Sequence, residues 1–391
     1  MSGKLPREVT VTAPINIALL KYWGKRNPAL MLPNNDSISL TVDELYAKTR
    51  IRAFNESSRQ NHEVLADSVI VNGEIMDVNT NNNRFQRCFS EIRRLAKEKE
   101  PELDTENMFF EVTSITNFPI RAGLASSAAG FAALTFGLGQ LFGLDEDTVS
   151  KAARLGSGSA CRSIFEGIVH WKAGTNDLGS DCKCETLYDN AHWPSLRAII
   201  VVTSDQEKHV TSTDGMQRTV ETSELYQHRI RFCVQKHLET ILKALREKDF
   251  PLLAETVIRE SNQLHAVCMD TYPSLQYLND ASKHVIRLVN AFNKKQGATK
   301  LAYTFDAGPN ACVLLEDVTL ADFLPYLCYY CPPSRQKGSE DKYIWGLQAE
   351  EVGSMQLKMR EPLPPEFQPY PGAAQFVVIS SVGKGPAVIK D

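Results

Sequence analysis

A turn rich in glycine and serine is the segment of this chain best suited to chemistry. Residues 117–130 read NFPIRAGLASSAAG and lead into an apolar run that continues to Leu144. Glycine lets the backbone approach a ligand closely, and the unpaired N–H groups at a helix N-terminus attract anions. The hydroxyls of Ser126 and Ser127 lie at the same point in the sequence. We therefore interpret this turn as a site for the phosphates of a nucleotide.

Other interpretations of the same run remain open from its residues alone. It would also suit a buried helix with a flexible start. Its most apolar part, residues 131–144, is interrupted by Gly137, Gly139 and Gln140 and is shorter than the roughly 20 residues of a membrane span, so we expect no membrane partner. The P-loop pattern G-x-x-x-x-G-K-[ST] is absent, so a nucleotide would be bound without a P-loop.

Cations stand beside aromatic residues or glycines at three other places. Residues 13–26 read APINIALLKYWGKR, and residues 156–163 read GSGSACRS with Arg162 just beyond the glycines. Arg84 stands at the start of a predicted helix. Lysine and the planar fork of arginine suit phosphates and carboxylates. The alternatives are a surface turn anchored by Trp23, a helix cap and solvated surface arginines.

Two polar segments of the second half complete the candidates. Residues 208–215, KHVTSTDG, read as a loop whose hydroxyls and lysine could bind phosphate. Asp306 lies in YTFDAGPN, on a turn bounded by Gly308 and Pro309. The side chain of an aspartate on a turn usually forms a hydrogen bond to the nearby backbone. Asp306 therefore becomes a candidate functional residue only when it is considered together with the other segments.

Composition limits the class of protein. The length of 391 residues predicts two or three domains, and 43% hydrophobic with 23% charged residues is ordinary for a globular protein. The net charge of −4 and the pI near 6.1 argue against a nucleic-acid partner. Nine irregularly spaced cysteines and an N-terminus without a signal pattern predict reduced thiols and a cytoplasmic location.

The elements that must position these residues follow from periodicity. Strands are predicted at 9–13, ended by Pro14, and at 45–54, 67–71, 108–113, 196–202, 311–315 and 376–380. Helical spacing marks 85–96, 149–154, 230–245 and 278–292, whereas 316–324 reads as surface. The second half thus resembles helices packed on an antiparallel sheet, an α+β arrangement. We place the domain boundary at residue 195, giving domains 1–195 and 196–391.

Four motifs in order carry a resemblance to a known family. The turn at 117–130 resembles the phosphate-binding motif of the GHMP kinase superfamily. Within that superfamily, residues 13–25, 156–162 and 305–310 resemble the mevalonate diphosphate decarboxylases. The resemblance implies a two-domain GHMP kinase fold of class α+β. Each domain is then a mainly antiparallel sheet packed with helices, the active site lies in the cleft between them, and the protein is a homodimer.

The resemblance also implies roles for individual residues. The implied catalytic residues are Asp306, Arg162, Lys25 and Ser127. The substrate pocket is implied at Tyr22, Trp23, Gly24, Lys25, Arg84, Ser157, Gly158, Ser159, Ala160, Cys161, Arg162 and Thr213. ATP is implied at Ala122, Gly123, Leu124, Ala125, Ser126, Ser127, Lys208 and Ser212. Mg²⁺ is expected on ATP rather than in a cluster of protein ligands, with Ser127 as its candidate protein contact.

The implied reaction is ATP-dependent decarboxylation of mevalonate 5-diphosphate to isopentenyl diphosphate, a precursor of isoprenoids and sterols. Asp306 would take the proton of the tertiary 3-hydroxyl, while Arg162 holds the carboxylate and orients Asp306. Arg121 departs from the small residue usual in the family at that position, and its effect on nucleotide affinity cannot be read from the sequence. A small-molecule kinase of the same fold and a non-catalytic binding module are the alternative functions.

Overall fold

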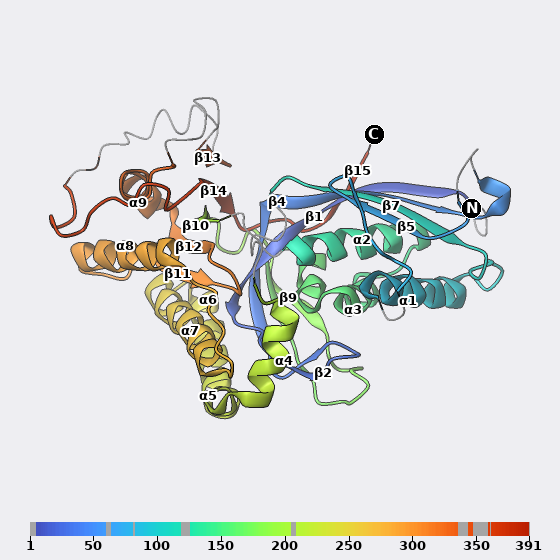
Figure 1. Cartoon of the computed structure of the whole chain (residues 1–391), viewed down its shortest axis with the longest axis horizontal. Coiled ribbons are helices and arrows are strands. Elements are labelled where there is room, and N and C mark those ends of the chain that lie inside the picture. Colours follow the sequence, from blue (N-terminus) through green and yellow to red (C-terminus); the bar gives the residue numbers. More distant parts are fainter. Residues whose placement is uncertain are drawn as a thin grey trace.

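The computed structural model describes residues 5–59, 64–80, 83–118, 126–204, 209–334, 343–346, 359 and 361–390. Its two lobes, each a sheet with helices, lie end to end (Figure 1). None of the helices in these ranges is both long and apolar enough to cross a membrane.

The first lobe is built on a large, mostly antiparallel sheet. Its central strands are β1 (Arg7–Leu20), β4 (Ser37–Phe54) and β7 (Phe109–Thr116), followed outward by β5 (Ser68–Val71) and β6 (Glu74–Ile75). Strands β8 (Ile168–Trp171) and β9 (Cys184–Tyr188) extend it from β4, and the last strand, β15 (Ala387–Ile389), pairs with β1. The short strands β2 (Lys25–Asn27) and β3 (Leu32–Pro33) form a separate hairpin.

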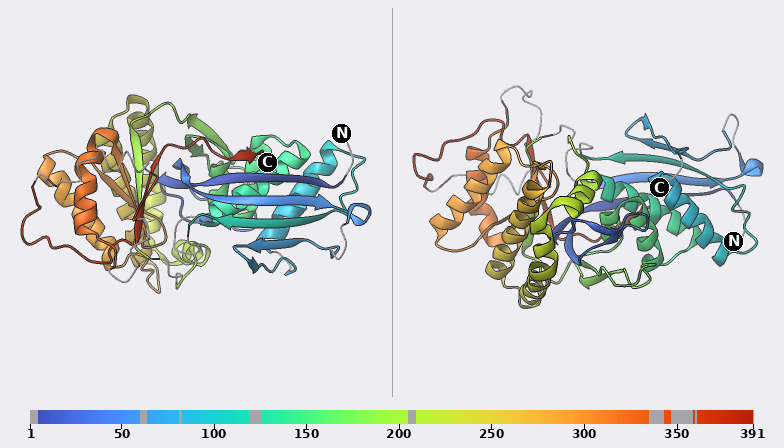
Figure 2. Two further views of the ribbon diagram at one scale, coloured as in Figure 1. Left: turned by 90° about the horizontal axis from the view of Figure 1, so that it is seen from above. Right: turned by 60° about the horizontal axis from the view of Figure 1, so that its bottom comes forward.

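Three helices cover one face of this sheet (Figures 1 and 2). They are α1 (Arg84–Lys99), α2 (Ser126–Phe142) and α3 (Glu146–Gly156). The 3₁₀ turn η1 (Glu56–Ser58) follows β4, and η2 (Gly158–Ile164) follows α3. Helix α2 is buried along most of its length because it lies between the sheet and α3, which explains why its sequence shows no polar face. The buried-helix interpretation and the phosphate-turn interpretation of this run are therefore compatible.

The second lobe is a sheet covered on both faces. Its order is β11 (Ala302–Phe305), β12 (Ala311–Glu316), β10 (Leu196–Val202), β14 (Phe376–Ser381) and β13 (Ile344–Trp345). Alternate residues of β10 point to opposite faces: Ile199 and Val201 pack with α8 (Asp280–Gln296) and α9 (Asp317–Tyr330), and Ala198 and Ile200 face the other core. The prediction of a strand buried on both faces at 196–202 is confirmed.

Helices α4 (Ser212–Thr222), α5 (Glu224–His228), α6 (Val234–Glu247) and α7 (Phe250–Asp270) connect the two lobes, with the π-helical turn η3 (Arg229–Cys233) between α5 and α6. Side chains of α6 and α7 share one hydrophobic core with β1, β4 and α2. The cleft between the lobes is thus lined by elements that are packed on a common core.

Several element predictions were wrong in instructive ways. Pro14 does not end the strand, because β1 continues to Leu20 with a register shift between Pro14 and Ile15 that accommodates the missing N–H. The predicted loop 208–215 contains the start of α4, capped by Thr211. The predicted surface segment 316–324 begins α9, whose Leu320 and Phe323 are buried.

Candidate active site

A cavity of about 390 Å³ lies between the two lobes, and it collects most of the residues predicted from the sequence. Both halves of the chain contribute, so the site forms only when the lobes are packed together. Its lining includes Tyr22, Trp23, Lys25, Arg84, Ser126, Ser127, Ser157, Gly158, Ser159, Arg162, Ser212, Thr213 and Asp306.

The chain enters the cavity from the end of β1. Trp23 is buried and donates from Nε1 to Thr219 Oγ1 at 3.1 Å, so it anchors the turn and lines the cavity at once. Gly24 has φ +92°, and a Cβ there would stand 2.0 Å from the hydroxyl of Tyr226. Glycine is therefore required at this position, although it does not itself line the cavity.

An ion pair between Lys21 and Asp306 lies at the edge of the cavity. Lys21 Nζ lies 2.6 Å from Asp306 Oδ1, and the lysine side chain is 1% exposed against 37% for the aspartate. The carboxylate therefore faces the cavity while its partner lies behind it. The nearby imidazole of His265 adds no second positive charge, because burial lowers its pKa to about 4.

Arg162 is held in place by residues of the first lobe. Its Nε donates to Asn16 Oδ1 at 3.0 Å and its NH1 to Ser37 Oγ at 2.8 Å, and the side chain is buried. The amide of Asn16 also donates to Ser159 O and Ser163 Oγ. Asn16 therefore connects Arg162 with the glycine–serine turn, and the guanidinium is fixed before any ligand arrives.

The N-terminal turns of two helices line the cavity. Ser126 and Ser127 begin α2, and Ser127 Oγ lies 3.3 Å from Ser157 Oγ. Ser212 and Thr213 form the first turn of α4. Both ends favour negatively charged groups. The predicted residues Arg121, Ala122, Gly123, Leu124, Ala125 and Lys208 lie outside the described residues.

The cations of the cavity are crowded. Burial and the neighbouring guanidiniums of Arg84 and Arg87 lower the pKa of Lys25 to about 8. Arg84 itself lies 4.6 Å from the ring centre of Phe131 and donates to Gly156 O. Such a concentration of positive charge is stabilised when an anion binds between the side chains.

A second cavity of about 580 Å³ adjoins the first and shares Arg84, Ser126 and Ser127 with it. Its remaining lining is mainly apolar, with Val69, Val71, Met76, Phe85, Val112, Phe131 and Leu134. A cleft that is charged at one end and apolar at the other suits a ligand with phosphates and a flat ring system.

Two predicted residues lie behind the cavity. Ala160 and Cys161 belong to η2 and are buried, and Cys161 packs with Trp171, Cys182 and Cys184. All nine cysteines are free thiols. Among the described residues, no group of three or more His, Cys, Asp or Glu side chains could hold a metal ion.

Comparison with known proteins assigns the family. Residues 13–184 match the model of the diphosphomevalonate decarboxylase-like N-terminal domain, and residues 198–389 match that of the mevalonate 5-diphosphate decarboxylase C-terminal domain. The chain belongs to the diphosphomevalonate decarboxylase family. The resemblance inferred from its four motifs is therefore confirmed.

Relatives of this family match over the whole length. The diphosphomevalonate decarboxylase of Rattus norvegicus is 39% identical over 100% of this chain and 96% of its own. Mevalonate diphosphate decarboxylase from Trypanosoma brucei superposes with a TM-score of 0.86 at 34% identity, covering 98% of both chains. MDDEF in complex with MVAPP, AMPPCP and magnesium gives a TM-score of 0.72 at 29% identity, covering 99% of this chain and 100% of that one. The predicted α+β GHMP kinase fold is thus confirmed.

Reasoning from the sequence missed several residues of the site. Lys21 was part of a quoted motif but received no role, and Asn16, Ser37 and Glu260 were not singled out. Glu260 carried a detectable signal, because it lies on the stripe of α7 that includes Val257 and Leu264, both of which are buried. A carboxylate on a buried stripe must have a partner, which the sequence could not name.

Proposed function

We propose that the first cavity binds mevalonate 5-diphosphate and that the adjoining cavity and the start of α2 bind ATP. The chain is an ATP-dependent diphosphomevalonate decarboxylase, which releases isopentenyl diphosphate, ADP, phosphate and CO₂. The observation that carries the residue assignment is the Lys21–Asp306 pair, whose carboxylate faces the cavity that also contains the α2 N-terminus.

The substrate fits the charges of the first cavity. Lys25, Arg84 and the N-terminus of α4 with Thr213 meet the diphosphate, because together they supply the positive charge that a polyanion needs. Arg162 meets the carboxylate, for which its buried and pre-oriented guanidinium is suited. Tyr22, Trp23 and the turn of Ser157, Gly158 and Ser159 enclose the remaining carbon chain.

ATP fits the adjoining cavity. The nucleobase lies against the apolar side chains and the phosphates lie at Ser126 and Ser127. Mg²⁺ usually takes several of its ligands from substrate phosphates and few from protein, so the hydroxyl of Ser127 at a phosphate site is a fitting contact. When bound, Mg²⁺ neutralises charge on the transferring phosphoryl group.

Asp306 then acts on the tertiary 3-hydroxyl. The carboxylate accepts its proton as the hydroxyl oxygen bonds to the γ-phosphorus, and ADP departs. The C3–O bond breaks and phosphate leaves. The C1–C2 bond then breaks, CO₂ is released, and its electron pair forms the C2–C3 double bond. The ion pair with Lys21 holds the Asp306 carboxylate in place at the cavity for these steps.

An assay that follows ADP and ¹⁴CO₂ from carboxyl-labelled substrate tests the reaction and its base. Asp306→Asn keeps the size of the side chain but removes the base, and we expect kcat to fall by at least about 10²–10³ with little change in KM. Turnover near that of the unsubstituted protein would exclude this role. Phosphorylated product without CO₂ would indicate a kinase instead.

The same assay distinguishes the roles of Arg162 and Arg84. Arg162→Gln should lower kcat more than Arg84→Gln, because only Arg162 is assigned to the carboxylate that leaves as CO₂. Equal effects on kcat and KM in both variants would make Arg162 a binding residue only.

We further propose a homodimer in the cytoplasm and a domain boundary near residue 195, with β15 returning to the first lobe. Light scattering during size-exclusion chromatography measures the mass of the assembly. A mass of one chain, 43.7 kDa, would exclude the dimer.

A further inference from the structure

One turn of α7 contacts both sides of the Lys21–Asp306 pair. The backbone N–H of Lys21 donates to Glu260 Oε2 at 2.9 Å. The adjacent residue, Ser261, accepts at Oγ from the backbone N–H of Phe305 at 3.0 Å, and Phe305 immediately precedes Asp306. Two consecutive residues of a rigid helix therefore hold the main chain beside each charged partner.

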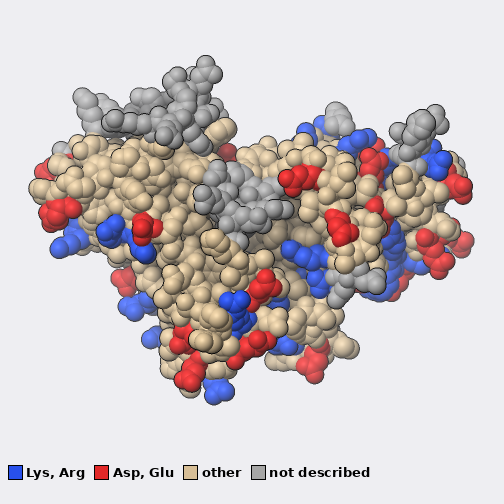
Figure 3. Space-filling model, viewed as in Figure 1, with Lys and Arg blue, Asp and Glu red and all other residues tan. Residues whose placement is uncertain are grey.

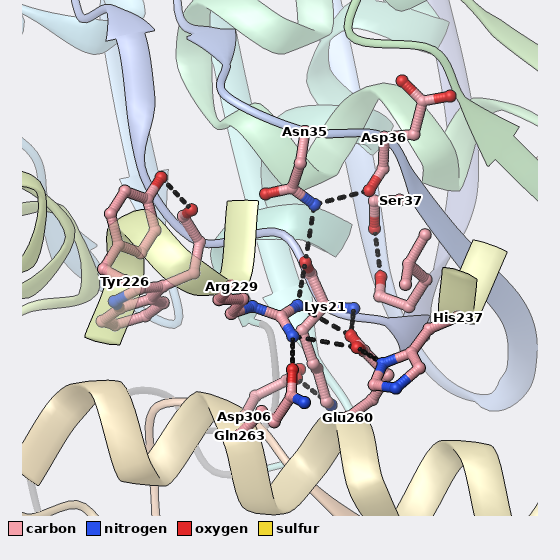
Figure 4. A network of polar contacts seen from close by, with 12 residues as sticks. Lys21, Asn35, Asp36, Ser37, Tyr226, Arg229, His237, Glu260, Gln263 and Asp306 are labelled. Atoms are coloured by element: carbon pink, nitrogen blue, oxygen red, sulfur yellow. Dashed lines mark hydrogen bonds and ion pairs between the residues drawn. The ribbon is translucent and has the colours of Figure 1, made fainter. Parts of the chain in front are cut away.

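Glu260 is itself fixed by a buried network of charges (Figure 4). Arg229 donates to both carboxylate oxygens, at 2.9 and 2.7 Å, and His237 Nδ1 lies 2.5 Å from Oε1. Arg229 also reaches the carbonyl oxygen of Lys21, at 3.3 Å, and Asn35 donates to the same oxygen at 3.0 Å. Both polar groups of the Lys21 backbone are thus bonded to side chains.

The burial of this network makes it rigid. The exposed fractions of Glu260 and Arg229 are 0% and 2%. Burial alone would raise the pKa of Glu260, but the charge and hydrogen bonds of Arg229 and the bond to His237 lower it to about 2. Ion pairs removed from water lose much of their stabilising effect to desolvation, so stability by itself does not account for a charge cluster at this place.

We propose that Glu260 and Ser261 are positioning residues of the reaction, which together set the 2.6 Å separation of Lys21 Nζ and Asp306 Oδ1. This inference rests on the proposed roles of Lys21 and Asp306. A base must lie within hydrogen-bond reach of the proton it accepts, and a displacement of about 1 Å can lower a rate about 100-fold. The α7 turn links the strand end of one lobe to the catalytic turn of the other.

Ser261→Ala is the first test, because it removes one neutral hydrogen bond and should leave the protein folded. We expect kcat to fall about tenfold while the KM values for both substrates stay within about twofold. Thr256→Val is the matched control: this buried hydroxyl of the same helix donates to Leu252 O at 2.9 Å, and within the described part of the chain it bonds to nothing outside α7. An unchanged kcat in Ser261→Ala, or an equal loss in the control, would overturn the proposal.

A double-mutant cycle with Lys21→Met distinguishes a positioning role of Ser261 from a purely structural one. A purely structural role would give the same loss of kcat whether or not Lys21 is present. If Ser261 acts through the ion pair, Ser261→Ala should lower kcat less than about twofold once the lysine is absent, although its effect on the melting temperature persists. A tenfold loss in both backgrounds contradicts the proposal. Radiolabelled CO₂ release keeps the low turnover of the Lys21→Met background measurable.

Glu260→Gln provides a second variant with a larger expected effect. It leaves the buried Arg229 without its charge partner, so we expect kcat to fall about 100-fold together with a lower melting temperature. The proposed function fails if Asp306→Asn and Lys21→Met turn over normally. Only the positioning role fails if those two variants lose activity while Ser261→Ala does not.

Discussion

The surroundings of Lys25 disfavour the protonated form of its amine. Its pKa is lowered from 10.5 to about 8 by burial first and then by Arg84 and Arg87, whereas Asp214 opposes the shift. A bound diphosphate reverses this, because negative charge at short range favours the protonated amine. Lysine side chains are protonated over the whole neutral range in most proteins, whereas Lys25 titrates near pH 8.

This shift predicts the pH dependence of substrate capture. Below about pH 8 Lys25 is cationic and attracts the diphosphate, and above it the neutral amine does so less. We therefore expect kcat/KM for mevalonate 5-diphosphate to decline as pH rises through about 8, mainly through KM. Initial rates from pH 6.5 to 9.5 measure this.

Lys25→Arg is the control for that profile. Arginine keeps its charge across the whole range, so the decline near pH 8 should disappear even if the absolute rate is lower. If the same decline persists in Lys25→Arg, another group causes it.

Lys21 is the residue whose removal tests the ion pair directly. Lys21→Met conserves most of the buried volume but takes the positive charge away from Asp306, so we expect kcat to fall about 10²–10³ with KM within about threefold. The variant should remain folded by circular dichroism. A kcat within twofold of the unsubstituted protein would show that the charge is unnecessary.

At the scale of elements, the turn after β1 is shaped by its contact with α5. Tyr226 on α5 donates to Trp23 O at 2.9 Å and accepts from Asn34 Nδ2 at 2.7 Å. The hydroxyl occupies the space where a side chain at Gly24 would begin. The glycine thus lets a helix of the linking region press against the turn that carries Lys25.

Gly24→Ala tests that contact. We expect a loss of about 2–4 kcal/mol in the free energy of unfolding, because both the φ of +92° and the 2.0 Å contact with Tyr226 oppose a Cβ. Gly73→Ala is the matched control: its φ is +86° but nothing lies within 4 Å, so it should lose only about 1 kcal/mol. Urea unfolding of both variants gives the difference, and equal losses would mean that the contact with α5 contributes nothing.

At the scale of the whole molecule, the end of the chain returns to the first lobe. Strand β15 pairs with β1 through Thr10–Ile389, Val11–Val388 and Thr12–Ala387. On the way, the backbone N–H groups of Lys384 and Gly385 donate to Asp43. Basic and acidic side chains lie mixed along the lower edge and the right-hand lobe of the face drawn in Figure 3. The C-terminal segment is held by the strand pairing and the hydrogen bonds to Asp43.

Removal of residues 384–391 should therefore destabilise the first lobe, even though these residues belong to the second half of the chain. We expect the melting temperature to fall by about 3–8 °C, because a strand and two hydrogen bonds to Asp43 are lost. Removal of residues 390 and 391 alone, which lie beyond β15, is the control. Equal melting temperatures for the two truncations would show that β15 adds no stability.

The sequence alone determined the family, the two-sheet fold class and the chemical types at the site. These depend on local features: glycines at turns, alternation along strands such as 196–202, and hydroxyls that precede an apolar helix. Prediction from the sequence was wrong where it relied on a single local feature. Pro14 does not end its strand, because a register shift after it accommodates the missing N–H. The charged residues of 316–324 suggested surface, although the segment begins α9 and has a buried face.

The tertiary structure decided which groups act together. Lys21 and Asp306 are 285 residues apart, and Lys21 and Glu260 are 239 apart. No periodicity or propensity records such pairings, because they arise only when two lobes pack on one core and bring the end of β1 against α7 and the turn after β11. The sequence alone thus showed Asp306, the cations and the phosphate-binding turn. The packing of the two lobes decided that Lys21 is the partner of Asp306.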